Sequence, residues 1–167
     1  IMDIAQGLRA LHSFDPPIGH GNLRGASVMI DEGPRAMLAD FGLSKLLESA
    51  DCEPFSAVGL ADDPARWLAP ELWQGEGKFT VKADVYAWGM TVLELMTHEA
   101  PYREDIHEHN TVFKAARGEH PLQPMEREVI ERGLDDELWR FLEQCWLLDY
   151  NQRPSIERVI EVLSSRR

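Results

Sequence analysis

The chain has 167 residues, of which 44% are hydrophobic, so it is long enough and apolar enough to bury the core of a single folded domain. Its 29 acidic residues outnumber its 17 basic residues and give a net charge of −12. Because nucleic acids and anionic membrane surfaces bind basic patches, this charge excludes both as expected partners.

The two cysteines, Cys52 and Cys145, are too few for a disulfide framework, so we expect a reducing compartment and a cytoplasmic location. No run of about 18 apolar residues predicts a membrane span. The first residues lack the pattern of a signal peptide. They lie within a helical pattern that has no N-cap, so we expect a fragment, which leaves an upstream targeting or anchoring segment open.

The first 40 residues predict a helix followed by a hairpin. Apolar residues recur at helical spacing over residues 1–12, and Pro16 marks the end of this amphipathic helix. Two short apolar runs follow, at residues 28–30 and 36–39. The residues between them, Asp-Glu-Gly-Pro at 31–34, are typical of a turn, so we predict a β-hairpin.

The middle of the chain predicts a long loop and a buried helix. Residues 43–68 are polar, contain Gly and Pro, and have no sustained periodicity, which favours a functional loop over a short connector. Residues 85–96 are apolar on nearly every face, with Glu94 as the main exception, which predicts a helix buried all round. Thr80 is a candidate N-cap, and Asp84 lies where a first-turn negative charge is favourable.

The last third predicts three further helices. Residues 110–117 form a weak candidate, and residues 138–146 a stronger one that begins near Asp135 or Asp136. Ser155 is the expected cap of a last helix with four apolar residues on one face: Ile156, Val159, Ile160 and Leu163. The predicted fold class is therefore mainly α with a small β-hairpin.

Three motifs follow one another in an order and spacing that resemble the protein kinase family. They are HGNLRGAS at residues 20–27, DFG at 40–42 and APE at 69–71. The family's catalytic loop reads H-R-D-L-x-x-x-N and is followed by D-F-G and A-P-E. On this resemblance, the predicted hairpin lies under the nucleotide and residues 43–68 correspond to the activation loop.

The resemblance covers nearly the whole chain, but only the family's C-terminal lobe. No G-x-G-x-x-G-x-V motif and no V-A-I-K lysine precede the catalytic-loop motif. We therefore expect residues 1–167 to be a protein-kinase-like domain without its N-terminal lobe. Trp146 with Arg153-Pro154, and Arg66-Trp67 before the APE motif, resemble the tyrosine-kinase-like branch.

The resemblance implies ATP and Mg²⁺ as cofactors and assigns roles to the motif residues. Asp40, with Phe41 and Gly42, would hold the metal that bridges the phosphates. Asn22 stands where the family has its catalytic Asp, and an amide cannot take up a proton as a carboxylate does. Ser27 replaces the Asn that binds the second metal, and its hydroxyl is a weaker ligand.

Two further positions bear on the substrate and on regulation. Arg24 occupies the place where many serine/threonine kinases have a Lys near the transferred phosphate. Some tyrosine kinases have Arg there, so the acceptor class stays open. Gly21 replaces the Arg that pairs with a phosphorylated activation loop, so a phosphate on that loop would lose its usual partner.

Other matches to the family are structural. His20 and Phe41 resemble the lower members of its hydrophobic spine. Glu71 and Arg153 resemble its buried ion pair, which predicts that they contact each other. Asp84 resembles the Asp that accepts hydrogen bonds from backbone N–H groups of the catalytic loop.

The substitutions indicate a pseudokinase that acts as a binding or scaffold module for a protein partner. The first alternative is a weakly active, ATP-dependent Ser/Thr or Tyr protein kinase whose N-terminal lobe is missing from this chain. The second is an unrelated acidic helical interaction domain in which the DFG motif occurs by chance. Without a phosphate-cradling loop, this chain alone is expected not to bind Mg-ATP with useful affinity.

Overall fold

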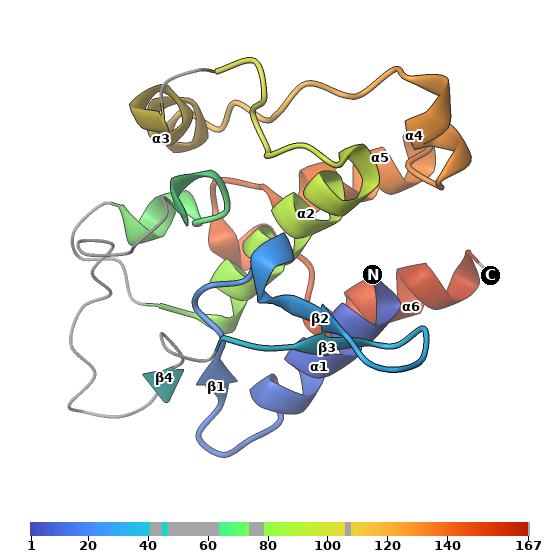
Figure 1. The fold of residues 1–167 in the computed structure, drawn as a ribbon. Coiled ribbons are helices and arrows are strands. Elements are labelled where there is room, and N and C mark those ends of the chain that lie inside the picture. Colours follow the sequence, from blue (N-terminus) through green and yellow to red (C-terminus); the bar gives the residue numbers. More distant parts are fainter. Residues whose placement is uncertain (41–44, 47–63, 74–78, 106–107, 167) are drawn as a thin grey trace.

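The computed structural model describes residues 1–40, 45–46, 64–73, 79–105 and 108–166. Within them the chain is mainly helical, with short strands near its beginning (Figure 1). The helices are α1 (Met2–His12), α2 (Val81–Thr97), α3 (Glu108–Ala116), α4 (Arg127–Glu131), α5 (Asp136–Cys145) and α6 (Ile156–Ser165). The strands are β1 (Ile18–Gly19), β2 (Val28–Ile30), β3 (Ala36–Leu38) and β4 (Lys45–Leu46).

The predicted first helix and hairpin are both confirmed, and they pack together. Strands β2 and β3 are antiparallel, with Met29 opposite Met37. The Asp3 carboxylate of α1 accepts a hydrogen bond of 3.0 Å from the backbone N–H of Ala36, which ties the helix to the hairpin. On its other side α1 packs against α6, so the two ends of the chain lie close together (Figure 1).

One strand pair was not predicted. Strand β4 lies within the segment 43–68, which the sequence indicates to be a loop, and it pairs antiparallel with β1. A two-residue strand carries no periodicity, and its partner lies far away in the sequence, so no local pattern reveals it. Apart from β4 and residues 64–68, this segment lies outside the described residues.

The predicted buried helix is confirmed as α2, which crosses the middle of the molecule (Figure 1). Every residue from Ala83 to Leu93 is buried. The helix begins at Val81, directly after the predicted cap position, so its first turn precedes the apolar run and contains Lys82 and Asp84, whose polar groups make specific contacts. Thr80 is its N-cap residue, as predicted, but its side chain makes no capping hydrogen bond.

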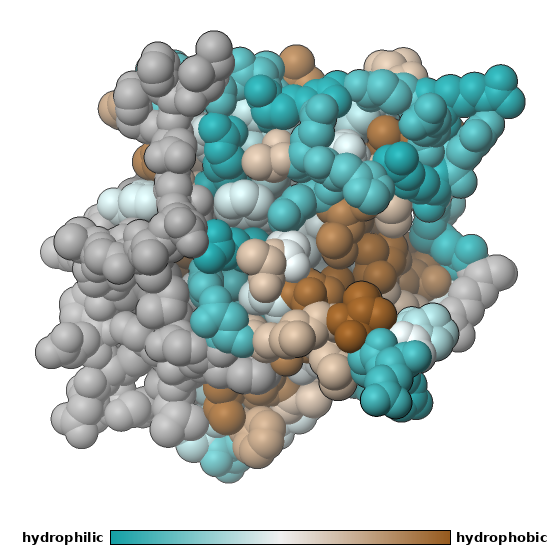
Figure 2. All heavy atoms as spheres, viewed as in Figure 1, coloured by the Kyte–Doolittle hydropathy of each residue, from teal (hydrophilic) through white to brown (hydrophobic). Residues whose placement is uncertain are grey.

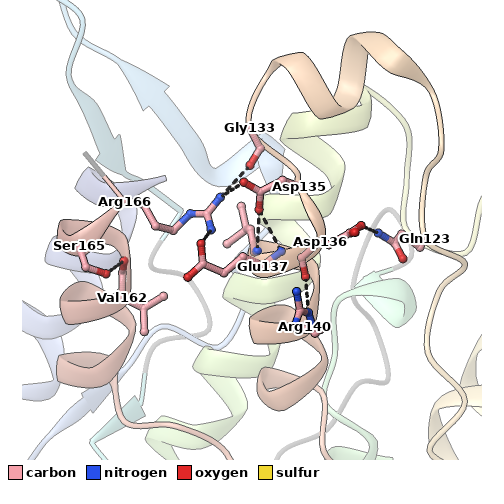
Figure 3. A network of polar contacts seen from close by, with 10 residues as sticks. Gln123, Gly133, Asp135, Asp136, Glu137, Arg140, Val162, Ser165 and Arg166 are labelled. Carbon is pink, nitrogen blue, oxygen red and sulfur yellow. Dashed lines mark hydrogen bonds and ion pairs between the residues drawn. The ribbon is translucent and has the colours of Figure 1, made fainter.

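The predicted start of α5 near Asp135 or Asp136 and the predicted cap of α6 at Ser155 are both confirmed. Asp135 accepts hydrogen bonds from the N–H groups of Glu137 and Leu138 at the start of α5, and Ser155 accepts one from Arg158 in α6. Near the end of α6, Arg166 donates to Asp135 at 2.7 Å and to Glu137 at 2.8 Å (Figure 3). This network joins the end of α6 to the beginning of α5. The short helix α4 was not predicted.

Hydrophobic side chains gather around the hairpin, whereas the surface over α4 is mostly hydrophilic (Figure 2). On the hairpin, Met29, Ile30 and Met37 are exposed. Among the described residues, no helix combines the length and the apolar character needed to cross a bilayer. Cys145 is buried, which raises the pKa of its thiol and leaves it unreactive.

Candidate functional site

Asp84 anchors the segment that holds the first motif. Its carboxylate accepts hydrogen bonds from the backbone N–H groups of His20, at 2.9 Å, and Gly21, at 3.0 Å. The ring Nε2 of His12 lies 2.9 Å from the same carboxylate. Asp84 is 1% exposed, so its charge is stabilised by these donors rather than by water. The predicted contact between Asp84 and residues 20–27 is confirmed.

His20 links this segment to the residues before Asp40. Its ring Nε2 lies 3.0 Å from the carbonyl oxygen of Ala39, which can only accept, so Nε2 carries the proton. The other ring nitrogen, Nδ1, accepts a hydrogen bond of 3.3 Å from the N–H of Asn22. Burial lowers the pKa of the His20 ring, although the nearby Asp84 carboxylate acts to raise it. The neutral form of the ring is therefore favoured twice, because Nδ1 acts as an acceptor and because the ring is buried.

Two residues of the site have left-handed backbone conformations. Gly21 has φ of +79°, which glycine adopts without steric cost. Asp40 has φ of +62°, which is uncommon for a residue with a side chain. Such conformations persist where surrounding contacts over-determine them, and they cluster at functional sites.

Asn22 and Asp40 are in direct contact. The side-chain Nδ2 of Asn22 donates a hydrogen bond of 2.7 Å to Oδ2 of Asp40. Asp40 is exposed and Asn22 is partly buried. The base position of the first motif and the carboxylate of the second are therefore joined by a charge-assisted hydrogen bond.

The hydroxyl of Ser27 is already engaged in hydrogen bonds within its own turn. Ser27 is fully buried; its hydroxyl donates to the carbonyl of Arg24 at 2.8 Å and accepts from the N–H of Arg24 at 2.9 Å. These bonds close the turn at residues 24–27. The carbonyl of Ser27 accepts the N–H of Ala39 at 2.8 Å, which fixes the approach to Asp40.

The closing stretch, residues 66–71, is clamped by three side chains. The Arg66 guanidinium donates to the carbonyls of Pro101, Tyr102 and Asp105, each at 2.8 Å. The indole Nε1 of Trp67 donates to the Glu94 carboxylate at 2.8 Å. Residues 66 and 67 thus bind different elements.

The third clamp is the predicted pair of Glu71 and Arg153, which is confirmed. The two side chains form a bidentate contact with both N–O distances at 2.7 Å. The Arg153 side chain is 0% exposed and that of Glu71 is 12% exposed. Arg153 also donates to the carbonyls of Leu147 and Lys82 and lies over the ring of Tyr86. Every part of this buried cation is thereby matched.

One contributor to the site was not assigned a role from the sequence. Glu94 of α2 accepts hydrogen bonds from the N–H of Gly25 as well as from Trp67. The sequence pattern could have indicated this role, because Glu94 interrupts an otherwise apolar helix. A charged side chain in such a helix needs hydrogen-bond or ion-pair partners.

Comparison with known protein families gives a match over nearly the whole chain. The profile of a family described as "Protein tyrosine and serine/threonine kinase" matches residues 1–163. The chain belongs to this protein kinase family.

Individual relatives agree with that result. A probable serine/threonine-protein kinase of Dictyostelium discoideum is 30% identical over 164 residues, which are 98% of this chain and 17% of the relative. Mitogen-activated protein kinase kinase kinase 1a of Physcomitrium patens is 35% identical over 158 residues, 94% of this chain and 19% of the relative. Serine/threonine-protein kinase CTR1 of Arabidopsis thaliana is 30% identical over 165 residues, which are 96% of this chain and 18% of the relative. The chain spans less than a fifth of each of these three relatives.

Kinases of this family use ATP and Mg²⁺, so the site can be tested for its fit to a metal. Mg²⁺ prefers several oxygen ligands in octahedral geometry. Within the described parts of the chain, no three His, Cys, Asp or Glu side chains gather closely enough to hold a metal ion. Asp40 shares Oδ2 with Asn22, and the Ser27 hydroxyl is buried in its turn. Of the two predicted metal positions, Asp40 offers an exposed carboxylate, whereas the Ser27 hydroxyl is held in its turn, so the described residues fit one protein ligand at these positions rather than two.

Some predicted site residues stay untested. Phe41 and Gly42 lie outside the described residues, and so does the contact expected between Phe41 and His20. Arg24 is partly buried, and its backbone closes the turn with Ser27. Its expected place near a transferred phosphate stays a prediction.

Proposed function

We propose that residues 1–167 are the C-terminal lobe of a pseudokinase domain of the tyrosine-kinase-like branch, which acts as a binding or scaffold module for a protein partner. The hydrogen bond from Asn22 to Asp40 carries this proposal. By its resemblance to the catalytic-loop motif, Asn22 stands where the family has its proton acceptor, and its amide instead donates a hydrogen bond to the Asp40 carboxylate.

The chemistry of phosphoryl transfer explains why this exchange matters. Proton uptake from the acceptor hydroxyl by a positioned base is worth roughly 10²–10⁴-fold in rate. Asn22 cannot hold that proton, although it can still hydrogen-bond a hydroxyl. Ser27 adds a second loss, because its hydroxyl would have to leave two hydrogen bonds with Arg24 before it reached a metal. Both losses support a binding role over a catalytic one.

A protein partner suits the surface better than the excluded alternatives. The net charge of −12 disfavours nucleic acid and anionic membranes. Residues 68–70 of the closing stretch are buried, so another protein would meet its partly exposed side chains Arg66, Trp67 and Glu71, which their contacts hold in place. Preorganised surfaces lose less conformational freedom on binding.

The test compares phosphate incorporation by four forms of the full-length protein at saturating ATP and Mg²⁺. These are the wild type, Asn22→Asp, Ser27→Asn and the double variant. The assay requires the Gly-rich loop and Lys of an N-terminal lobe. Because catalytic groups that act as a unit are non-additive, we expect the double variant to exceed either single variant. We expect the wild type to be at least about 10²-fold slower than the double variant.

The opposite result would reverse the proposal. A wild-type rate within about tenfold of the double variant would mean that Asn22 positions the acceptor well enough without a base. The second candidate function, a weakly active protein kinase, would then be correct. The observation that favours it is the retained Asp40, which is exposed and lies beside the base position.

A further inference from the structure

The segment between α3 and α4 carries apolar side chains on its outer side (Figure 1). Residues 119–126 form neither helix nor strand, and burial within them repeats every three residues. Pro121 and Pro124 are buried, whereas Leu122 is 71% exposed and Met125 is 77% exposed. A polyproline II segment has three residues per turn, so Leu122 and Met125 share one face of it.

The start of α4 continues this apolar face. Glu126 is the N-cap residue of α4, so Met125 and Ile130 occupy the N′ and N4 positions, which are neighbours at the beginning of a helix. Ile130 is 44% exposed, while Val129 beside it is buried. Among the described residues, Leu122 and Met125 are the two most exposed large hydrophobic side chains.

The backbone below these side chains is held by polar contacts. Nε2 of Gln123 donates to Oδ1 of Asp136 at 2.9 Å, which joins the segment to the start of α5 (Figure 3). Arg103, in the loop after α2, forms an ion pair with Glu126. A segment that is already held in place loses little conformational freedom when it binds a partner.

The surroundings of this apolar face are hydrophilic and negatively charged (Figure 2). Residues 119–137 contain seven acidic residues and two arginines. Two further arginines reach this region from other elements, and each is shared between two carboxylates. They are Arg103, with Glu99 and Glu126, and Arg166, with Asp135 and Glu137. Negative charge therefore remains in excess.

We propose that Leu122, Met125 and Ile130 form a docking surface for a basic segment of a partner protein that carries apolar side chains. The apolar side chains of that segment remove the three residues from water, and its Lys and Arg side chains pair with the surrounding carboxylates. The same charge disfavours a second copy of this chain, whose net charge is −12, and an anionic membrane. The proposal goes beyond the proposed function, because the surface contains no residue of the candidate site.

The experiment measures the binding of synthetic peptides to the 167-residue chain by isothermal titration calorimetry. The first peptide, of about twelve residues, has Leu at every third position and Arg between, to match the spacing of Leu122 and Met125. The second has Glu in place of Arg, and the third has Ser in place of Leu. We expect the first to bind at least about tenfold more tightly than either of the others, and its affinity to fall as the salt concentration rises.

Two double variants locate the binding. Leu122→Ser with Met125→Ser removes two apolar anchors and should weaken binding of the first peptide at least about tenfold. The matched control, Met29→Ser with Ile30→Ser, changes two hairpin side chains that are 57% and 64% exposed, and it should leave the affinity unchanged. Thermal unfolding verifies that each variant folds. If the first double variant does not fold, Met125→Ser alone decides, with a smaller loss of affinity expected.

The proposal is overturned if the Glu or the Ser peptide binds as tightly as the first, or if the two double variants lose affinity equally. It is also overturned if the free chain is a dimer that Leu122→Ser with Met125→Ser dissociates, or if that variant abolishes binding to anionic lipid vesicles. Phosphate transfer enters none of these measurements. An active kinase would therefore refute the proposed function and leave the docking surface intact, whereas an inactive chain that failed these tests would do the reverse.

Discussion

The side-chain amide of Asn22 stabilises the negative charge of the Asp40 carboxylate. Two carboxylates at the distance between Asn22 and Asp40 would repel each other unless a cation lay between them, whereas an amide donates a hydrogen bond to the carboxylate. The neighbouring backbone supports the same arrangement, since Asp40 has φ of +62° and the carbonyl of Ala39 is held by His20. At the residue scale, the Asn22 amide and the backbone around residues 39–40 hold the Asp40 carboxylate in place.

The exchange Asn22→Asp should therefore destabilise the chain in metal-free buffer at neutral pH. The expected loss is about 1 kcal/mol, a small value because Asp40 is exposed and water screens the repulsion. The measurement is urea unfolding of the wild type and the variant in the presence of a chelator. The double exchange Asn22→Asp with Asp40→Asn recreates an amide–carboxylate pair and should recover most of the loss. Equal stability of the wild type and Asn22→Asp would contradict this account.

His20 provides a pH dependence at the same scale. Burial lowers the pKa of its ring in the folded chain, so the unfolded chain binds the proton more readily. Stability is therefore complete above the unfolded pKa, about 6.5, and is lost as the pH falls below it. We expect the urea concentration at the midpoint of unfolding to decrease when the pH is lowered from 7.5 to 5.5. The decrease should be smaller in His20→Gln. His120 is shifted in the same direction, so the difference between the two forms isolates His20. A fall of equal size in both forms would exclude His20 as the source.

At the scale of elements, polar contacts between distant segments fix the closing stretch. Arg66 donates to backbone carbonyls in the loop after α2, and Trp67 donates to Glu94 of α2. Glu71 pairs with Arg153, which precedes α6. These partners are spread along the chain, so the closing stretch is ordered only when the helices are packed.

The pair of Glu71 and Arg153 should be worth far more than a surface pair. Glu71→Gln leaves the buried Arg153 cation without its counter-charge, and we expect a loss of about 3–5 kcal/mol in the free energy of unfolding. The control is Glu161→Gln, which removes the partner of Arg158 in a pair whose side chains are 62% and 65% exposed. That exchange should cost less than about 1 kcal/mol. Denaturant titration measures both, and equal losses would mean that burial of the first pair has no energetic effect.

At the scale of the whole molecule, the chain presents a helical core with an apolar hairpin at one side (Figures 1 and 2). Asp40, at the position predicted to hold a metal, accepts a hydrogen bond from Asn22, and the Ser27 hydroxyl is bonded to Arg24. A ligand stabilises a protein in proportion to RT ln(1 + [L]/Kd), so weak nucleotide binding has almost no thermal effect.

We therefore expect millimolar Mg-ATP to change the melting temperature of the 167-residue chain by less than about 1 °C. Thermal unfolding with ATP and Mg²⁺, with ATP and a chelator, and with neither ligand provides the comparison. A clear rise that requires Mg²⁺ would mean that Asp40 and its neighbours form a working metal site in this chain.

The sequence by itself determined the family, the main helices, the hairpin, the start of α5 near Asp135 or Asp136, the cap at Ser155, and the contact of Glu71 with Arg153. These follow from periodicity and local hydrogen bonding, or from motifs whose spacing is intact. Only the tertiary structure decided that Asn22 donates to Asp40, that Ser27 turns back on Arg24, and that Glu94 serves two segments. It also revealed the pairing of β4 with β1. These features depend on which groups meet across long sequence distances, and side-chain hydrogen bonds of that kind have no local signature.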